Sequence, residues 1–186
     1  MTNRLSFGAL FVNLLGCAST APAESAAPIA VGEASSQLDG KRYRETRVGV
    51  HIDAPPAAVW AVLTDGPAYP SWNSTVTSLE GTIAPGEEIK LKVKLDPKRT
   101  FNLEVSTFEA PTRLVWQDGN AMFKGVRTFT LTALPDGSTD VTMAEVMTGS
   151  MMGMIAKKLP DFRPDFDTFM RDLKATVETA AQTTAT

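Results

Sequence analysis

The stretch FKGVRTFTLTALPDGSTDVTMAEVMT, residues 123–148, decides the fold of this 186-residue chain. Apolar and polar side chains alternate on both sides of its centre, and this period of two predicts β-strands over Phe123–Leu134 and Thr139–Thr148. The segment Pro135-Asp136-Gly137-Ser138 between them is typical of a hairpin turn. A turn centred near Asp136 predicts three opposed pairs: Leu131 with Val141, Phe129 with Met143, and Arg127 with Glu145.

A helical pattern follows this hairpin. Apolar residues recur in it at spacings of three or four: Met151, Ile155, Leu159, Phe162, Phe166, Phe169, Met170, Leu173 and Val177. That spacing is the period of one helix face packed on a core. Pro160 and Pro164 divide the pattern into a short first piece and a main helix predicted over Pro164–Ala180.

The residues before the hairpin predict a strand over Tyr43–Ile52, a helix over Ala57–Leu63 and a short helical turn at Tyr69–Asn73. Alternation predicts four more strands: Thr75–Gly81, Glu88–Leu95, Thr100–Phe108 and Arg113–Gln117. The segment Asp96-Pro97-Lys98 predicts the turn between the second and third of these. We therefore expect an α+β domain in which a curved antiparallel sheet wraps around the long C-terminal helix.

The composition is that of one globular domain and argues against several function classes. The chain has 18 Lys and Arg against 21 Asp and Glu, and this formal net charge of −3 argues against a nucleic-acid partner. One cysteine excludes an internal disulfide and a cysteine-rich metal site, and one histidine excludes His-pair metal motifs. The sequence therefore predicts no metal and no other cofactor.

The first 16 residues have the pattern of a secretory signal, in which Arg4 precedes the apolar stretch Leu5–Leu15. The following Leu14-Leu15-Gly16-Cys17 resembles the lipobox of bacterial lipoproteins, in which the cysteine is lipidated after cleavage. Residues 18–40 are rich in Ala, Ser, Thr, Pro and Gly, a composition that buries little apolar surface. We therefore predict a signal over 1–16, a flexible tether over 17–40 and a domain over 41–182.

These features predict that a lipidated Cys17 anchors the domain at the cell envelope, facing the periplasm. A plain signal peptide with a chance cysteine is one alternative, and it predicts a secreted protein. A misassigned start codon is another. Membrane contact is expected only through this anchor, because no apolar run approaches the roughly 18–20 residues that span a bilayer.

Five short stretches carry a resemblance to a known family: Tyr69-Pro70-Ser71-Trp72-Asn73, Leu114-Val115-Trp116, the segment from Gly125 to Leu131, Asp136-Gly137-Ser138-Thr139, and Glu145 followed by Gly149. In this order they resemble the START and Bet v 1-like superfamily, also called SRPBCC, and within it the polyketide cyclase/dehydrase-like branch. The resemblance covers Tyr43–Val177. It implies a helix-grip fold with an apolar cavity between sheet and helix.

Members of this superfamily bind lipids, sterols, polyketides or other hydrophobic molecules, and a minority are cyclases or dehydratases. The resemblance therefore implies a small hydrophobic ligand. Many relatives have His at the position of Arg127, so any role of that His does not transfer to this chain.

Arg127 and Glu145 are the candidate polar residues of the cavity. Facing each other on the inward side of the hairpin, they would mark its polar end and bind a carboxylate, phosphate or carbonyl of the ligand. A structural ion pair at the rim, or a bulge that turns Arg127 outward, is the alternative. The candidate apolar ligand contacts, which ordinary core packing explains equally well, are Trp72, Trp116, Phe123, Phe129, Met143, Phe162, Phe166, Phe169 and Met170.

Three functions follow from these residues. The first is a cell-envelope protein that binds a small hydrophobic molecule. The second is a cyclase, dehydratase or hydrolase with Glu145 as acid/base and Arg127 as oxyanion support, although an inward His and a Ser–His or Cys–His couple are both missing. The third is an interaction module with a filled interior. An apolar cavity of about 300 Å³ or more would favour ligand binding over the third function.

Overall fold

One antiparallel sheet of eight strands and one long helix dominate the computed structural model, which describes residues 34–39 and 43–184. The strand order is β1-β2-β8-β7-β6-β5-β4-β3. The strands are β1 (Ala34–Asp39), β2 (Tyr43–Ile52), β3 (Val76–Glu80), β4 (Glu88–Val93), β5 (Asp96–Glu109), β6 (Arg113–Gly119), β7 (Lys124–Ala133) and β8 (Thr139–Thr148). The helices are α1 (Pro56–Thr64), η1 (Gly66–Ala68), α2 (Tyr69–Trp72), α3 (Met152–Ile155), η2 (Ala156–Lys158) and α4 (Arg163–Thr184).

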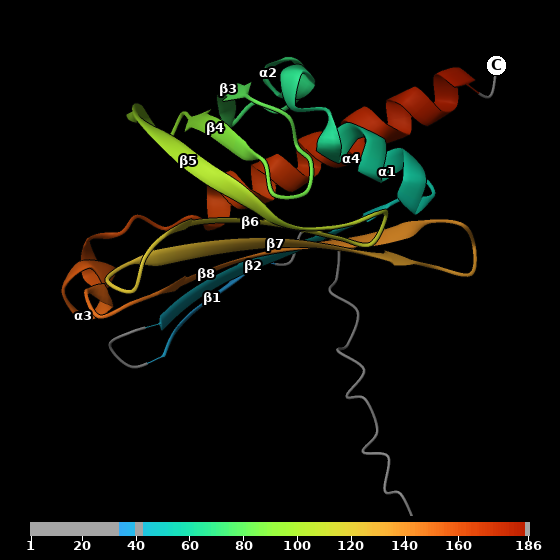
Figure 1. The fold of residues 1–186 in the computed structure, drawn as a ribbon. Coiled ribbons are helices and arrows are strands. Elements are labelled where there is room, and N and C mark those ends of the chain that lie inside the picture. The colour runs from blue at the N-terminus through green and yellow to red at the C-terminus, as the bar shows by residue number, and fades with distance from the viewer. Residues whose placement is uncertain (1–33, 40–42, 185–186) are drawn as a thin grey trace, which may run out of the picture.

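The predicted α+β architecture, a curved sheet around a C-terminal helix, is confirmed. Figure 1 shows α4 lying across one face of the sheet, with α1 and α2 on the same side. A single hydrophobic core lies between these helices and the sheet. The opposite face of the sheet carries no helix among the described residues (Figure 1).

The β7–β8 hairpin has the predicted register. All three expected pairs are present: Leu131 with Val141, Phe129 with Met143, and Arg127 with Glu145. In the turn, the Asp136 carboxylate accepts a hydrogen bond of 3.0 Å from the backbone N–H of Ser138. Gly137 has φ 88°, in the left-handed region that glycine enters without a steric penalty. The turn residues therefore fix which side chains of the two strands face the helix.

Helix α4 confirms the predicted apolar period. It begins at Arg163, whose backbone N–H donates a 3.0 Å hydrogen bond to the Asp161 carboxylate, and Pro164 occupies its first turn. Its buried face consists of Phe166, Phe169, Met170, Leu173 and Val177. Burial of each such side chain contributes about 1.5–3 kcal/mol. This face holds the helix on the sheet.

The turn between β4 and β5 lies earlier than predicted. Val93 pairs with Asp96, so the chain turns at Lys94 and Leu95 and β5 begins at Asp96. The predicted turn at Asp96-Pro97-Lys98 is therefore wrong. Pairing of Val93 with Asp96 leaves a two-residue connection, the shortest common hairpin loop. The strand pairing overrides the turn preference of Pro97.

Strand β1 lies within the segment predicted to be a flexible tether. Residues Ala34–Asp39 pair antiparallel with β2, from Ala34 with Val48 to Asp39 with Tyr43. The sheet thus begins seven residues before the predicted domain start at 41, and for residues 34–39 the tether prediction is corrected. Added to β2, this strand supplies backbone partners along an edge that would otherwise be open. The predicted signal, Cys17 and the rest of the tether lie outside the described residues.

Within residues 34–39 and 43–184, none of the helices is long and apolar enough to cross a bilayer.

Removing β1 should lower the stability of the domain. A chain that begins at residue 40 lacks the six pairings between β1 and β2, and we expect its free energy of unfolding to fall by about 1–3 kcal/mol relative to a chain that begins at residue 34. Urea denaturation of the two chains measures the difference. Equal stabilities would show that the β1–β2 pairing contributes nothing.

Candidate ligand cavity

A cavity of about 300 Å³ lies between the helix-covered face of the sheet and the first turns of α4. Strands β3 to β8, residues 159–162 and α4 all contribute to its wall. Six aromatic side chains form much of this wall: Phe101, Trp116, Phe123, Phe162, Phe166 and Phe169. The cavity has the size and the apolar, aromatic lining typical of small-molecule sites.

The structure brings seven of the predicted ligand contacts to this cavity: Trp116, Phe123, Arg127, Glu145, Phe162, Phe166 and Phe169. It places four outside the lining: Trp72, Phe129, Met143 and Met170. Sequence reasoning missed several apolar lining residues on other strands: Leu91, Val93, Leu103 and Met147.

Core packing explains why the four residues do not reach the cavity. Phe129 and Met143 point inward as predicted, but each is fully buried. The ring centroid of Phe129 lies 5.8 Å from that of Phe169 on α4, so here the helix rests directly on the sheet. Trp72 packs on Tyr69 with ring centroids 4.7 Å apart. Alternation thus identifies the inward face of a strand but not the point where the helix meets it.

Tyr69 anchors the short helix α2 behind the cavity wall. Its hydroxyl donates a 2.7 Å hydrogen bond to the carbonyl of Leu63, and its side chain is fully buried. Burial raises the pKa of the Tyr69 phenol, which therefore stays neutral. Its ring centroid lies 6.0 Å from that of Trp116, so Tyr69 supports one of the cavity's aromatic residues from behind.

Arg127 and Glu145 form an ion pair that faces the cavity. Arg127 Nε donates to Glu145 Oε2 at 2.6 Å, and the side chains are only 18% and 12% exposed. The guanidinium carbon of Arg127 lies 4.7 Å from the ring centroid of Phe166. The β7–β8 register runs without a shift, so no bulge turns Arg127 outward. The predicted inward pairing is confirmed.

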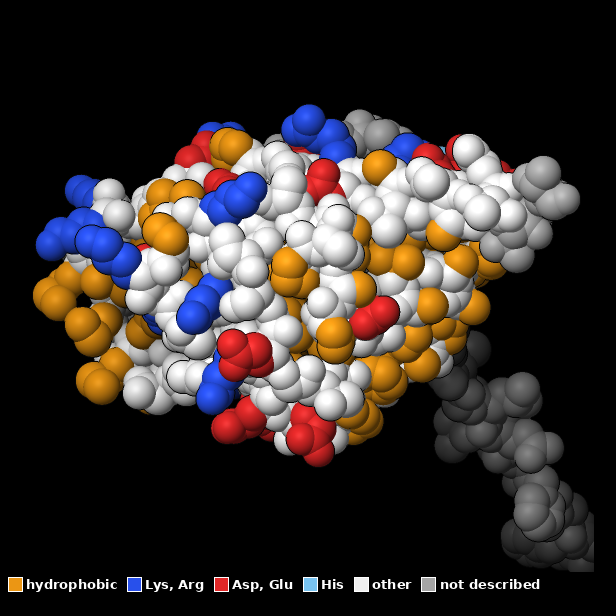
Figure 2. Space-filling view, turned by 90° about the horizontal axis from the view of Figure 1, so that it is seen from above, with side chains coloured by type: hydrophobic (Ala, Val, Ile, Leu, Met, Phe, Trp, Pro, Cys, Tyr) orange, Lys and Arg blue, Asp and Glu red, His pale blue; other side chains and the backbone are white. Residues whose placement is uncertain are grey.

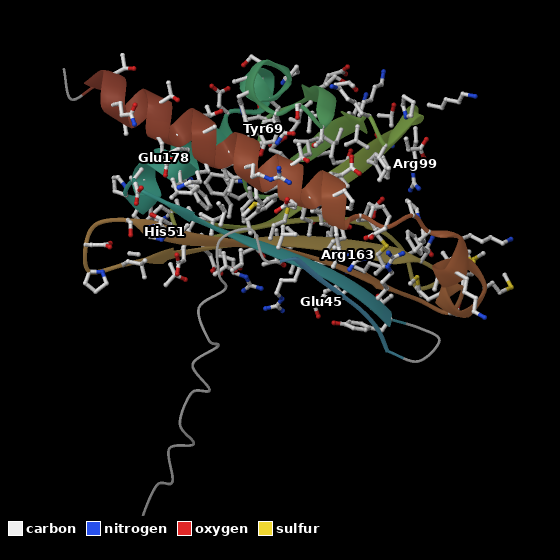
Figure 3. All side chains as sticks on the ribbon, turned by 180° about the vertical axis from the view of Figure 1, so that it is seen from behind. Glu45, His51, Tyr69, Arg99, Arg163 and Glu178 are labelled. Atoms are coloured by element: carbon white, nitrogen blue, oxygen red, sulfur yellow. The ribbon has the colours of Figure 1, made fainter. Side chains whose placement is uncertain are left out.

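A second ion pair, which sequence reasoning missed, lies on the same side of the sheet. Arg99 Nη2 of β5 lies 3.7 Å from Asp118 Oδ2 of β6, and the guanidinium of Arg99 lies 4.3 Å from the ring centroid of Phe101. Both charged residues line the cavity. Asp118 has the same parity as Trp116, which is the one sequence signal that would have placed it there. Figure 3 shows Arg99 near the end of α4 that begins at Arg163.

Residues 159–162 cover one side of the cavity and are held by Arg44 of β2. Arg44 Nη2 donates to the carbonyl of Pro160 at 2.8 Å, and Nη1 donates to the carbonyl of Leu159 at 3.5 Å. The Arg44 guanidinium also lies 5.2 Å from the ring centroid of Phe162. Side-chain contacts from the sheet therefore hold this covering segment, which contributes Leu159, Pro160 and Phe162 to the lining.

The end of the molecule at α3 exposes apolar side chains. Met122, Met151 and Met154 are 56%, 37% and 68% exposed. Figure 2 shows hydrophobic side chains gathered at this end, on the left of the view, with Lys and Arg side chains beside them.

The single histidine takes no part in the cavity. His51 lies on β2, where its Nδ1 is 2.9 Å from Asp140 and its Nε2 is 3.2 Å from Asp53. The Asp140 carboxylate, which accepts a hydrogen bond from the ring, raises the pKa of His51, and the hydrogen bond accepted by Asp53 adds to this shift. Figure 3 shows His51 at the opposite end of the molecule from Arg99. Within 34–39 and 43–184, no group of three or more His, Cys, Asp or Glu side chains is arranged to hold a metal ion.

Comparison with known proteins shows the family. Residues 43–178 match the family described as "Polyketide cyclase / dehydrase and lipid transport". This match covers well over half of the chain, which therefore belongs to that family. Curated protein sequences include no match to the chain.

Solved structures share the fold at low sequence identity. A START superfamily protein from Mycobacterium smegmatis has 16% identity and a TM-score of 0.54, over 73% of this chain and 98% of that one. The Zhui aromatase/cyclase from a Streptomyces species has 12% identity and a TM-score of 0.57, over 75% and 96%. A protein from Rhodobacter sphaeroides has 20% identity and a TM-score of 0.57, over 80% and 99%. These similarities establish a START-like, helix-grip fold.

A double-mutant cycle should show strong coupling between Arg127 and Glu145. Because both side chains are largely buried, Arg127→Met or Glu145→Met alone leaves the other charge without its partner, and we expect each change to cost about 3–5 kcal/mol. The double variant should regain much of that loss. Urea denaturation gives the coupling energy, which should exceed the roughly 0.5 kcal/mol of independent sites. Additive changes would show that the pair does not act as a unit.

Proposed function

We propose that this protein binds a small hydrophobic molecule in the cavity between α4 and the sheet. The observation that carries the proposal is the cavity itself, about 300 Å³ in volume and walled by six aromatic residues. A protein whose interior served only to hold the fold would fill such a space, because an apolar void costs stability. Membership of a cyclase, dehydrase and lipid-transport family supports the same role.

The binding role is favoured over the two alternatives. An open cavity argues against an interaction module with a filled interior. The enzyme alternative assigns the acid/base role to Glu145 and the oxyanion support to Arg127. Against it, these two side chains already hydrogen bond to each other. Among the described lining residues there is no Ser, Cys or His to act as a nucleophile or its base.

We further propose that binding takes place at the cell envelope, with Cys17 as the lipid anchor. The order of Arg4, an apolar stretch and Leu14-Leu15-Gly16-Cys17 supports this proposal. An acylated cysteine ahead of the domain would keep the cavity close to a source of hydrophobic molecules.

Filling the cavity should weaken ligand binding strongly while leaving the fold intact. Leu103→Trp adds a large ring to the lining, and we expect saturable binding of the neutral dye Nile red to fall at least about tenfold in a fluorescence titration. Asn102→Trp is the matched control, because this exposed neighbour on the same strand does not line the cavity. Unchanged dye binding by a folded Leu103→Trp variant would contradict the proposal.

Replacing Cys17 should release the protein from membranes. Cys17→Ser removes the only cysteine, and with it the only thiol that an acyl chain can occupy. In a bacterium that processes lipoproteins, the wild-type protein should sediment with membranes after ultracentrifugation and the variant should stay in the soluble fraction. A variant that still sediments with membranes would place the anchor elsewhere.

A further inference from the structure

We infer that the cavity selects a cationic amphiphile, an apolar molecule whose protonated amine binds between the carboxylates of Asp118 and Glu145. This inference rests on the proposed binding function and adds the chemical class of the ligand. It reverses the expectation that the polar end of the cavity binds a carboxylate or phosphate.

The first argument is the charge of the lining. Six charged side chains line the cavity, four acids and two arginines: Asp96, Asp118, Glu145, Asp165, Arg99 and Arg127. Their net charge is −2. Each arginine already lies beside a carboxylate, Arg99 beside Asp118 and Arg127 beside Glu145. Among the described residues, Asp96 and Asp165 have no ion-pair partner, so the excess charge of the site is negative. Such a site repels an anionic head group and attracts a cationic one.

The second argument is the convergence of two carboxylates over Gly125. A Cβ atom built on Gly125 would lie 2.8 Å from Asp118 Oδ1 and 3.2 Å from Glu145 Oε1. The sum of these two distances, about 6 Å, is the upper limit on the separation of the two oxygens. One ammonium group that donates hydrogen bonds of about 2.8 Å to each oxygen spans up to about 5.6 Å, so it bridges the two oxygens at all but the extreme of that range. Glycine at this position leaves room for both carboxylates to approach.

The third argument is that Asp118 Oδ1 and Glu145 Oε1 are available to accept hydrogen bonds from a ligand. Arg99 contacts the other oxygen of Asp118, Oδ2, and Arg127 contacts the other oxygen of Glu145, Oε2. Within the described part of the chain, no donor hydrogen bonds to Asp118 Oδ1 or Glu145 Oε1. Partly buried carboxylate oxygens are normally hydrogen-bonded, and a ligand N–H would satisfy both.

The aromatic wall supports the same ligand class. Cations bind favourably over aromatic faces, and quaternary and protonated amines are recognised by cages of such rings. The two arginines of the cavity already lie over Phe101 and Phe166. The remaining aromatic lining, which includes Trp116 and Phe123, offers further π surface beside the two carboxylates. A cavity with both features binds an amine by ion pairing and by cation–π contact.

A matched series of ligands tests this inference on the wild-type protein. Decylamine, decanol and decanoate share one alkyl chain and differ in the head group, which at neutral pH is cationic, neutral or anionic. Each is titrated against bound Nile red at low salt, and we expect decylamine to displace the dye at least about tenfold more tightly than decanoate. Equal affinities, or tighter binding of decanoate, would overturn the inference. Failure of Nile red and of all three ligands to bind would instead overturn the proposed function.

The variant Asp118→Asn locates the amine site. It removes one carboxylate whose ion-pair partner, Arg99, is half exposed, and we expect the affinity for decylamine to fall about tenfold while that for decanol is unchanged. Decanol binding also reports that the cavity is intact. Glu109→Gln is the matched control, since it removes one negative charge from the exposed far end of β5 and should change neither affinity. Unchanged decylamine affinity in Asp118→Asn would overturn the inference, and if this variant does not fold, the wild-type series decides.

Discussion

The packing of α4 against the sheet is the contact on which the rest of the structure depends, because it buries the apolar face of the helix and one face of the sheet together. Phe169 shows how this contact works: its ring lies beside Phe129 of the sheet and beside Trp72 of the short helix α2. One side chain of α4 thus joins three parts of the fold. On β7 and β8, inward residues at this contact, such as Phe129 and Met143, are buried in the core, whereas the inward pair Arg127 and Glu145 lines the cavity.

The cavity begins where that contact ends. Toward the start of α4 the inward positions change from Phe129 and Met143 to the ion pair of Arg127 and Glu145, and the space between helix and sheet opens. Charged residues there carry a desolvation cost that an apolar core would avoid. Such residues on this face, beside a second ion pair at Arg99 and Asp118, are expected of a binding site and not of an apolar core.

Local periodicity was sufficient to predict much of this arrangement. The alternation around Asp136 predicted the β7–β8 register residue by residue, and the three-and-four spacing predicted the buried face of α4. Features that depend on tertiary pairing were not predictable. Residues 34–39 have the composition of a linker, and only the open edge of β2 makes them a strand. The turn at Lys94 and Leu95 is likewise decided by pairing between β4 and β5, against the local signal of Pro97.

Within the described part of the chain, the covering segment at Leu159 and Pro160 hydrogen bonds to the sheet through one side chain, Arg44, and forms no strand ladder. Lifting it would break these two hydrogen bonds and the contacts of the Phe162 ring with Arg44 and Phe166, whereas opening the sheet itself would require several ladder bonds to break together. Displacement of the covering segment is therefore separated from global unfolding, and a ligand bound as proposed could enter and leave while the sheet stays paired.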